Sequence, residues 1–328
     1  MSGDNQSFDP DSADGLAYPE QENPGREAKA RRGADTEMDI FDGIRGAGGG
    51  PVEPVRLGPE DLFCFSCHRD VPCWNACCRG ADITLTPGDI LRLSTHFGIA
   101  PAEFLERHTV PAIWEQADLP VAKLRMGASL EEGGGDGKGD CPFLAGDEGC
   151  GVYAERPVTC RYYPLGLASV KMKGDEEKNS FHFLVKEDHC KGHGLDKLQS
   201  ISQYRDEQGL KNYDKINQGW IDILMKMASW KTLGGPQGKE IAAQTKQMFF
   251  LVSTNPPGFR QFVLETKFLD TYSVDPEFVE RIKTDDELLT CLGFDWLKNV
   301  MFNEPTIAMK EAVLQEAVAK ARGDLGAS

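Results

Sequence analysis

Nine of the ten cysteines lie between residues 64 and 190, and this crowding predicts a metal site. Five fall in one short stretch, C-F-S-C-H-R-D-V-P-C-W-N-A-C-C, which begins at residue 64. Thiolates are strong ligands of zinc and of iron–sulfur clusters, and a C-x-x-C turn lets two sulfurs reach one metal. We expect the metal ligands to be Cys64, Cys67, Cys73, Cys77, Cys78, Cys141, Cys150, Cys160 and Cys190.

The number of metals is left open by this count. A closed zinc site or a four-iron cluster takes about four protein ligands, so nine cysteines suit two sites, or one larger cluster with spare thiols. Cys77 and Cys78 are adjacent and could serve two neighbouring metals, or could form a strained disulfide that acts as a redox switch. Cys291 stands alone in the helix-like stretch D-D-E-L-L-T-C-L-G-F and is expected to pack as a small apolar residue.

Charged and imidazole side chains lie close to these cysteines in the sequence. Arg156 and Arg161 flank Cys160, and we expect at least one of them to contact the cluster sulfurs, because a guanidinium donates several hydrogen bonds without losing its charge. The alternative is a surface ion pair with Asp147, Glu148 or Glu155. His189 and His193 flank Cys190 and are either zinc ligands or exposed loop residues.

Composition narrows the class of protein. The net charge of −16 argues against nucleic-acid and anionic-lipid partners, which need clustered Lys and Arg. No apolar run is long enough to span a bilayer, and the acidic first residues do not form a secretory signal. We therefore expect a cytoplasmic location, where thiols stay reduced and crowded cysteines bind metal more often than they form disulfides.

The pattern along the chain predicts an α+β fold. Residues 1–56 have the composition of a disordered acidic, Gly-rich tail, residues 57–195 form a small irregular cysteine-rich domain, and residues 196–328 form an all-helical region. In the cysteine domain, Thr86-Pro87-Gly88-Asp89 begins a helix that Gly98 ends. Short strands are expected at 81–85, 121–126, 165–173 and 180–186, and helix-like apolar spacing occurs at 198–230, 239–253, 258–272, 276–283, 285–302 and 306–322.

Spaced blocks of the sequence resemble the YkgJ-type cysteine-cluster family. The blocks are Cys73-x3-Cys77-Cys78-Arg79, L-T-P-G-D-I-L-R-L from residue 85, C-P-F-L from residue 141, and G-C-x-V-Y-x-x-R-P-x-x-C-R-Y-Y-P from residue 149. The resemblance covers roughly residues 62–194. It implies a zinc- or iron-chelating domain, often one with an iron–sulfur cluster.

Three functions follow as hypotheses. The first is a metal-binding protein that holds an iron–sulfur cluster or zinc, with iron–sulfur slightly favoured. The second is an iron–sulfur-dependent enzyme, such as a protein lysine methylase, which one branch of the resembled family contains, or a redox protein. The third is an interaction module in which the metal is a structural staple and the helical region holds a protein partner.

Overall fold

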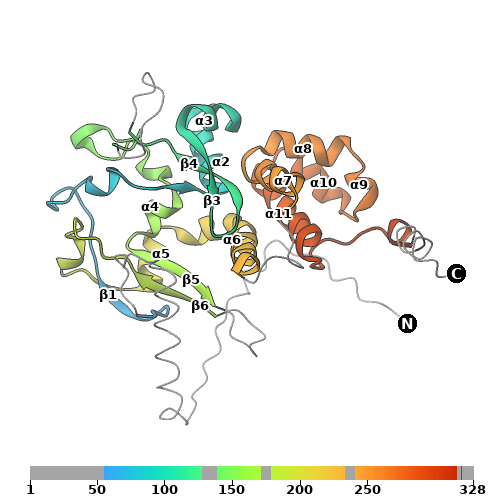
Figure 1. Ribbon diagram of the computed structural model, residues 1–328. Helices are drawn as coiled ribbons and strands as arrows, with labels where there is room; N and C mark the ends of the chain where they lie inside the picture. Colours follow the sequence, from blue (N-terminus) through green and yellow to red (C-terminus); the bar gives the residue numbers. More distant parts are fainter. Residues whose placement is uncertain (1–54, 128–138, 171–178, 233–240, 316–318, 320–328) are drawn as a thin grey trace, which may run out of the picture. The chain divides into compact units, whose positions relative to one another are not determined.

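The computed structural model describes residues 55–127, 139–170, 179–232, 241–315 and 319 (Figure 1). The expected tail therefore lies outside the described residues except for its last two positions, as does most of the turn between the two strands expected at 165–186. The cysteine-rich part contains β1 (Leu62–Cys64), β2 (Thr84–Leu85), α2 (Pro87–Phe97), α3 (Pro101–His108), β3 (Thr109–Trp114), β4 (Leu119–Leu124), α4 (Val158–Tyr162), β5 (Leu165–Val170) and β6 (Asn179–Leu184). The mixed α+β class is confirmed.

The strands described form small antiparallel sheets. Strand β4 pairs with both β2 and β3, and β5 pairs with β6. Strand β1 pairs with β7 (Leu198–Ser200), which lies more than 130 residues further along the chain. Strand β3 was not predicted, and β4 begins two residues before the expected position.

The later part of the chain is dominated by helices. They are α5 (Ile201–Glu207), α6 (Leu210–Thr232), α7 (Ala243–Thr254), α8 (Pro256–Glu265), α9 (Phe268–Thr271), α10 (Pro276–Ile282) and α11 (Asp286–Phe302). The prediction of one helix over 198–230 is wrong, because β7 occupies its start and Gly209 takes a left-handed conformation between α5 and α6. Ser200 caps α5 by accepting a hydrogen bond from the Gln203 amide. Within 306–322, the described helical residues are 311–315 and 319.

Helix α2 begins as its sequence predicts. The Thr86 hydroxyl accepts from the Asp89 amide, the Asp89 carboxylate accepts from the Thr86 amide, and Pro87 occupies the first turn. Gly98 ends the helix with φ 64°, a conformation that costs other residues more. The helix thus has well-defined ends, and its first turn is buried.

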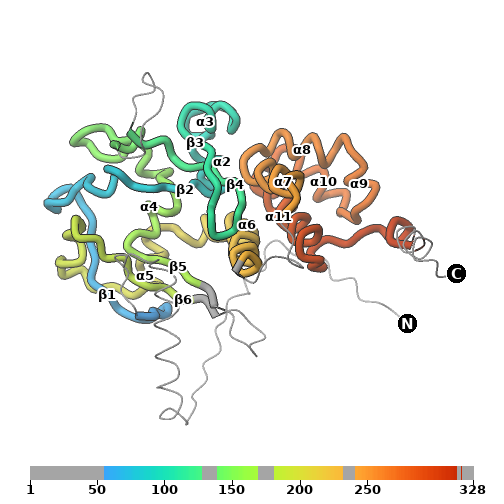
Figure 2. Tube along the Cα trace, in the orientation of Figure 1, coloured from blue at the N-terminus to red at the C-terminus, as the bar shows by residue number. Residues whose placement is uncertain are grey.

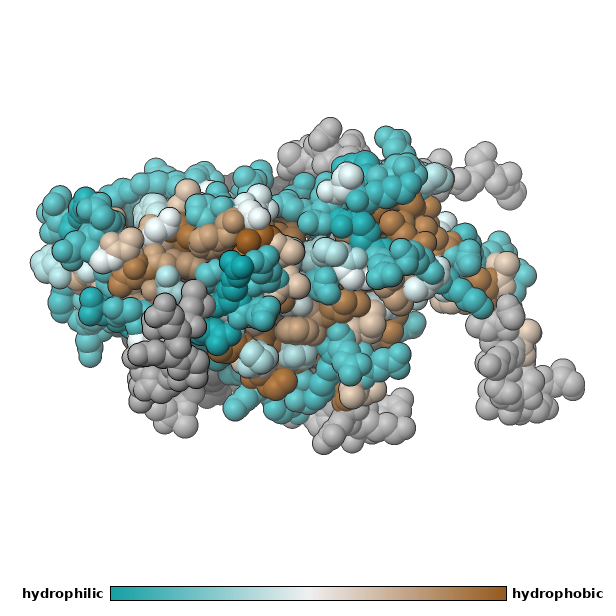
Figure 3. Space-filling view, turned by 90° about the horizontal axis from the view of Figure 1, so that it is seen from above, coloured by the Kyte–Doolittle hydropathy of each residue, from teal (hydrophilic) through white to brown (hydrophobic). Residues whose placement is uncertain are grey.

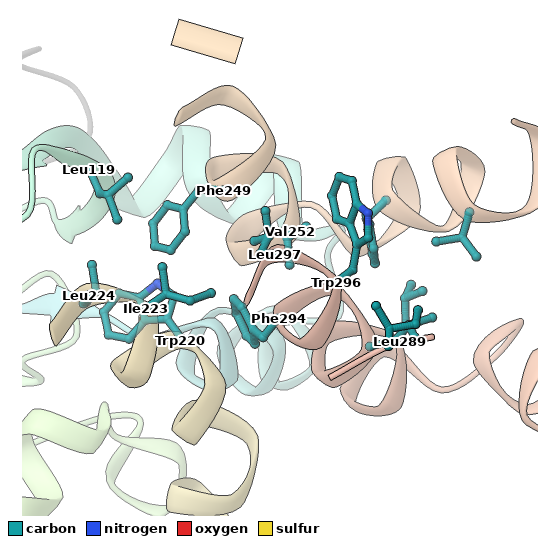
Figure 4. Packing of buried hydrophobic residues seen from close by; sticks show 14 of the residues in the cluster. Leu119, Trp220, Ile223, Leu224, Phe249, Val252, Leu289, Phe294, Trp296 and Leu297 are labelled. Atoms are coloured by element: carbon teal, nitrogen blue, oxygen red, sulfur yellow. The ribbon is translucent and has the colours of Figure 1, made fainter. Parts of the chain in front are cut away.

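Strand β4 has hydrophobic cores on both faces. Leu119 and Val121 belong to the core that α6, α7, α8 and α11 enclose, and Figure 4 shows Phe249 of α7 close to Leu119 and Ile223. Ala122 and Leu124 belong to a second core with side chains of α2 and α3. Because side chains alternate along a strand, one strand joins the helical region to the cysteine-rich part.

Further contacts cross the domain boundary that we expect near residue 195. Ile201 and Tyr204 of α5 pack with Phe63 and Phe65 in a third cluster, and Leu210 and Tyr213 of α6 pack with Val158 of α4 in a fourth. The boundary itself stays a prediction. These contacts mean that the early helices of the helical region support the cysteine segments directly.

The surface seen from above carries apolar side chains in separate groups between polar ones (Figure 3). Among the helices described, none has the length and apolar character needed to cross a membrane.

Candidate metal centre

Strand β1 fixes the start of the first cysteine segment. Its residue Phe63 is buried, as is Phe65 just beyond its end. Successive side chains alternate along a strand, so Cys64 lies on the opposite face, exposed and paired across the ladder with the exposed Leu198. The strand therefore points Cys64 away from the face on which the two phenylalanines pack.

Cys67, Cys73 and Cys190 are joined by contacts between two distant segments. The Ser66 amide donates to the Gly192 carbonyl at 3.1 Å, and the Lys191 amide donates to the Cys73 sulfur at 3.1 Å. Hydrogen bonds from backbone N–H groups stabilise the thiolate form that binds metals. In Figure 2, the segment that follows β1 runs beside the segment that precedes β7.

Cys77 and Cys78 lie in a short 3-10 turn, Ala76–Cys78, which Asn75 introduces with φ 66°. The tight turn brings the adjacent thiols together, and both are free rather than joined in a disulfide. The hydrogen bond from the Cys78 thiol lowers the pKa of Cys77 to about 7, although burial opposes this shift. The same hydrogen bond, with burial, raises the pKa of Cys78 far above its usual range.

A second loop carries Cys141 and Cys150. The Cys141 amide donates to the Cys78 carbonyl at 2.7 Å, which ties this loop to the 3-10 turn. Within the loop, the Gly151 amide donates to the Phe143 carbonyl at 2.8 Å, which brings the two ends of the loop close together. Burial raises the pKa of Cys141 to about 11, and it also raises the pKa of Cys150.

Cys160 is positioned by α4, and the carboxylate of Asp89 holds the start of that helix. Asp89 is fully buried, and its second oxygen accepts from the Val158 amide at 2.8 Å. Burial raises the pKa of Asp89 to about 6, against the effect of its hydrogen bonds. Part of Cys160 is exposed to solvent. Burial of its thiol by neighbouring residues nevertheless raises the pKa of Cys160 to about 12, and the negative charge of Asp89 adds to this shift.

The two arginines have different surroundings. The Arg156 guanidinium donates to the Tyr153 carbonyl and the Gln208 side chain, and its charge lowers the pKa of both Cys67 and Cys150 against the larger effect of burial. Arg161 instead donates to the carbonyls of Gln208 and Ala154 and lies over the Tyr213 ring. Arg156 is therefore the arginine within electrostatic range of thiols on two segments.

Of the acidic residues considered as arginine partners, Glu148 pairs with an arginine other than Arg156 and Arg161. Arg69 pairs with Glu148 at 2.8 Å and donates to the Asp147 carbonyl. These contacts anchor the loop between Cys141 and Cys150 to the first cysteine segment.

The histidines of this region have partners other than the thiols. Nε2 of His189 is 3.6 Å from a Glu187 oxygen, and Nε2 of His193 is 3.1 Å from the Val185 carbonyl. His182 is buried, and its Nε2 lies 2.7 Å from an Arg205 nitrogen. Burial, followed by the Arg205 charge, lowers the pKa of His182 to about 4.

Electrostatic contacts connect eight of the nine predicted ligands. The charges of Cys77, Cys73 and Cys190 act on Cys67, and those of Cys77, Cys141 and Cys150 act on both Cys78 and Cys160. Cys291 lies in α11, where the charges that act on it are those of Asp295, Glu287, Lys215 and Asp285. The eight connected thiols are Cys67, Cys73, Cys77, Cys78, Cys141, Cys150, Cys160 and Cys190.

This donor set fits a zinc ion or an iron–sulfur cluster in its chemistry, because it consists of soft thiols that gather from four segments. Within the described part of the chain, no three Cys, His, Asp or Glu side chains converge tightly enough to hold an ion as they stand. Closing the coordination shell therefore requires the side chains to move together, as expected where binding and folding are coupled.

An apolar groove of about 450 Å³ lies apart from these thiols. It is formed by side chains of α3, β3, β4 and α7, among them Leu105, Ile113 and Phe250. No cysteine lines this groove, so we do not assign it to the metal centre.

Comparison with known proteins agrees with the chemistry of the site. Residues 66–191 match the model of a family described as CxxCxxCC, putative zinc- or iron-chelating domain. The chain thus contains a domain of this cysteine-cluster family, as the resemblance in its sequence predicted. The matched range includes the eight connected thiols and excludes Cys64 and Cys291. No curated protein and no solved structure matches the chain.

Proposed function

We propose that this protein binds metal and holds an iron–sulfur cluster or zinc through clustered cysteine thiolates. The observation that supports the proposal most strongly is that electrostatic contacts connect eight thiols from four segments that are far apart in the sequence. A fold that needed these cysteines only as small apolar residues would have no reason to gather them.

The donors favour an iron–sulfur cluster slightly over zinc. Zinc sites often include histidine, whereas iron–sulfur clusters are held mostly by cysteine thiolates. Here His189 and His193 lie beside Glu187 and the Val185 carbonyl, which leaves sulfur as the main donor type. A bound cluster would supply electron storage, and bound zinc would supply a rigid link between segments.

Residues around the thiols support metal binding through hydrogen bonds, helix positioning and positive charge. The Lys191 amide donates to Cys73, Asp89 holds the helix that carries Cys160, and Arg156 offers positive charge to thiols on two segments. The hydrogen bond from Cys78 lowers the pKa of Cys77, which favours the thiolate form of Cys77. We leave Cys64 out of the proposed ligand set because the family match begins at residue 66.

The enzyme, the interaction module and the cytoplasmic location stay predictions.

The proposal is tested by purifying the full chain without oxygen and measuring zinc, iron, acid-labile sulfide and the visible spectrum. A brown protein with iron and sulfide selects a cluster, and a colourless protein with zinc selects a zinc site. Metal-free protein that also fails to take up either metal under reducing conditions would refute the proposal.

A further inference from the structure

The second loop is docked on the first cysteine segment by contacts that involve no sulfur atom. At the start of the loop, the Cys141 amide donates to the Cys78 carbonyl at 2.7 Å, and the Gly80 amide donates to the Gly139 carbonyl at 2.9 Å. Backbone groups make both hydrogen bonds, so neither bond needs a metal ion in order to form. The start of the loop is therefore held by the peptide chain itself.

The 3-10 turn in the middle of the loop meets two side chains of the same segment. The Asn75 amide group donates to the Gly146 carbonyl at 3.2 Å, and Arg69 donates to the Asp147 carbonyl at 3.1 Å. Arg69 also pairs with Glu148, but 56% and 80% of these two side chains are exposed, and exposed ion pairs contribute little to stability. These polar contacts orient the loop more than they stabilise it.

The indole of Trp74 packs directly against Gly149, which ends the 3-10 turn. A Cβ atom at Gly149 would lie 2.7 Å from an indole carbon, which is too close for a real methyl group. Gly149 also has φ 94°, a conformation that favours glycine. The indole nitrogen of Trp74 is shielded from solvent, so the ring is enclosed where the loop meets the segment. Aromatic side chains of this size supply most of the apolar area at such a contact.

We propose that Trp74 and Gly149 are positioning residues of the metal centre, and that they dock the second loop on the first cysteine segment before metal binds. Both adjoin predicted ligands, because Trp74 follows Cys73 and Gly149 precedes Cys150. Their packing fixes the backbone beside one ligand from each segment. This inference rests on the proposed function and adds to it the residues that assemble the two segments.

Docking of the backbone separates two steps of metal binding. The coordination shell closes by movement of the cysteine side chains, whereas the two segments that carry them are already joined. Ordering a site in advance strengthens binding, because less chain entropy is lost when the ligand arrives. Loss of the contact between Trp74 and Gly149 should therefore weaken metal affinity.

The first test is hydrogen exchange of the full chain under reducing conditions, read by peptide mass spectrometry before and after chelation. The amides of Cys141 and Gly80 should stay protected after chelation in the parent and should lose protection in Gly149→Ala. The matched control is Gly146→Ala, which should retain protection. Gly146 also has a positive φ, 54°, but an added methyl group meets no atom of the described residues within 4 Å.

Two exchange results would overturn the inference and leave the proposed function intact. Free exchange of both amides in the chelated parent would show that docking needs the metal. Unchanged protection in Gly149→Ala would show that the contact with Trp74 does not hold the loop.

The second test measures Co²⁺ affinity of the reduced full chain through the sulfur-to-cobalt absorption, against a competing chelator. Gly149→Ala should weaken affinity by roughly 10–100-fold, as the loss of groups that support metal ligands does. Trp74→Phe removes the indole atoms that the added methyl group would strike, so combining it with Gly149→Ala should recover part of the loss. The remaining loss reflects the backbone conformation at this position.

The recovery separates positioning from general destabilisation, because Trp74→Phe by itself only removes packing atoms. Equal losses from Gly149→Ala with and without Trp74→Phe would contradict the positioning role. A parent chain that binds no Co²⁺ would contradict the proposed function, whereas the exchange experiment judges the docking of the loop by itself.

Discussion

Arg156 and Arg161 are five residues apart, yet they contact different parts of the molecule. The Arg156 charge reaches the thiols of Cys67 and Cys150, whereas Arg161 lies over Tyr213 and donates to the Gln208 carbonyl. One sequence motif thus contains an arginine suited to stabilising thiolates and another that joins α4 to the later helices.

This difference gives a prediction for a matched pair of substitutions. Arg156→Gln should weaken metal affinity by roughly 10–100-fold, as the loss of groups that support metal ligands does. Arg161→Gln should mainly reduce the free energy of unfolding, because it removes backbone hydrogen bonds and a stacking contact. Chelator competition and urea unfolding of both variants provide the measurements. Equal metal affinity in Arg156→Gln and the parent would disprove the role of Arg156.

The lowered pKa of His182 leads us to expect that folding stability depends on pH through a group other than the thiols. Its pKa is about 4 in the folded protein, below the ordinary 6.5, chiefly because burial disfavours the charged ring. Its contribution to stability is therefore present above pH 6.5 and is lost as the pH falls toward 4, because the unfolded chain binds the proton first. The loss amounts to at most about 3 kcal/mol.

The measurement is urea unfolding of the parent and of His182→Gln between pH 7 and pH 4.5, with the exposed His68→Gln as control. The stability of the parent should fall more steeply over this range than that of His182→Gln, and His68→Gln should follow the parent. Parallel curves for all three proteins would show that His182 is not the titrating group.

At the scale of elements, the start and end of helix α2 were easier to predict than the pairing of strands. The helix that begins at Thr86 was predicted with its correct cap, because a capping box and Pro87 are local signals. Strand β7 was mistaken for the start of a helix, because its three residues adjoin a helical pattern and their partner, β1, is more than 130 residues away. Local periodicity does not encode such a pairing.

Asp89 shows that local sequence signals also miss the long-range contacts of the candidate metal centre. Its sequence position identified it as a residue of the first helical turn, but its hydrogen bond to the Val158 amide depends on the tertiary fold. The nine candidate ligands were named from spacing alone, whereas the exposure of Cys64 on the face of β1 opposite Phe63 and Phe65 follows from the alternation of side chains on that strand.

Asp89 therefore links helix capping to the metal centre. Asp89→Ala should reduce stability by about 1–2 kcal/mol through loss of the cap and should also weaken metal affinity, because α4 and Cys160 lose their anchor. The control is Asp275→Ala, which removes the cap of α10 in the helical region. Asp275→Ala should lower stability without changing metal affinity, as measured by urea unfolding and chelator competition. Unchanged metal affinity in Asp89→Ala would contradict the positioning role.

At the scale of the whole molecule, the cysteine segments are supported by the helical region as well as by each other. Strand β4 is shared by two hydrophobic cores, and α5 packs beside the phenylalanines that fix β1. The thiols thus sit in a framework that extends well beyond residues 66–191, which match the chelating family. This framework explains how thiols from segments separated by a hundred residues come within electrostatic range of one another.

The measurement that tests this account most directly is metal-dependent protection of each cysteine from alkylation, read by peptide mass spectrometry. In the metal-loaded full chain, the eight connected thiols should be protected and Cys64 should react; after chelation, the eight should react as well. Cys291 should react at the same rate with and without metal, because its partial burial does not depend on the centre. Protection of Cys64 by metal, or free alkylation of several of the eight in the loaded protein, would contradict the proposed metal centre.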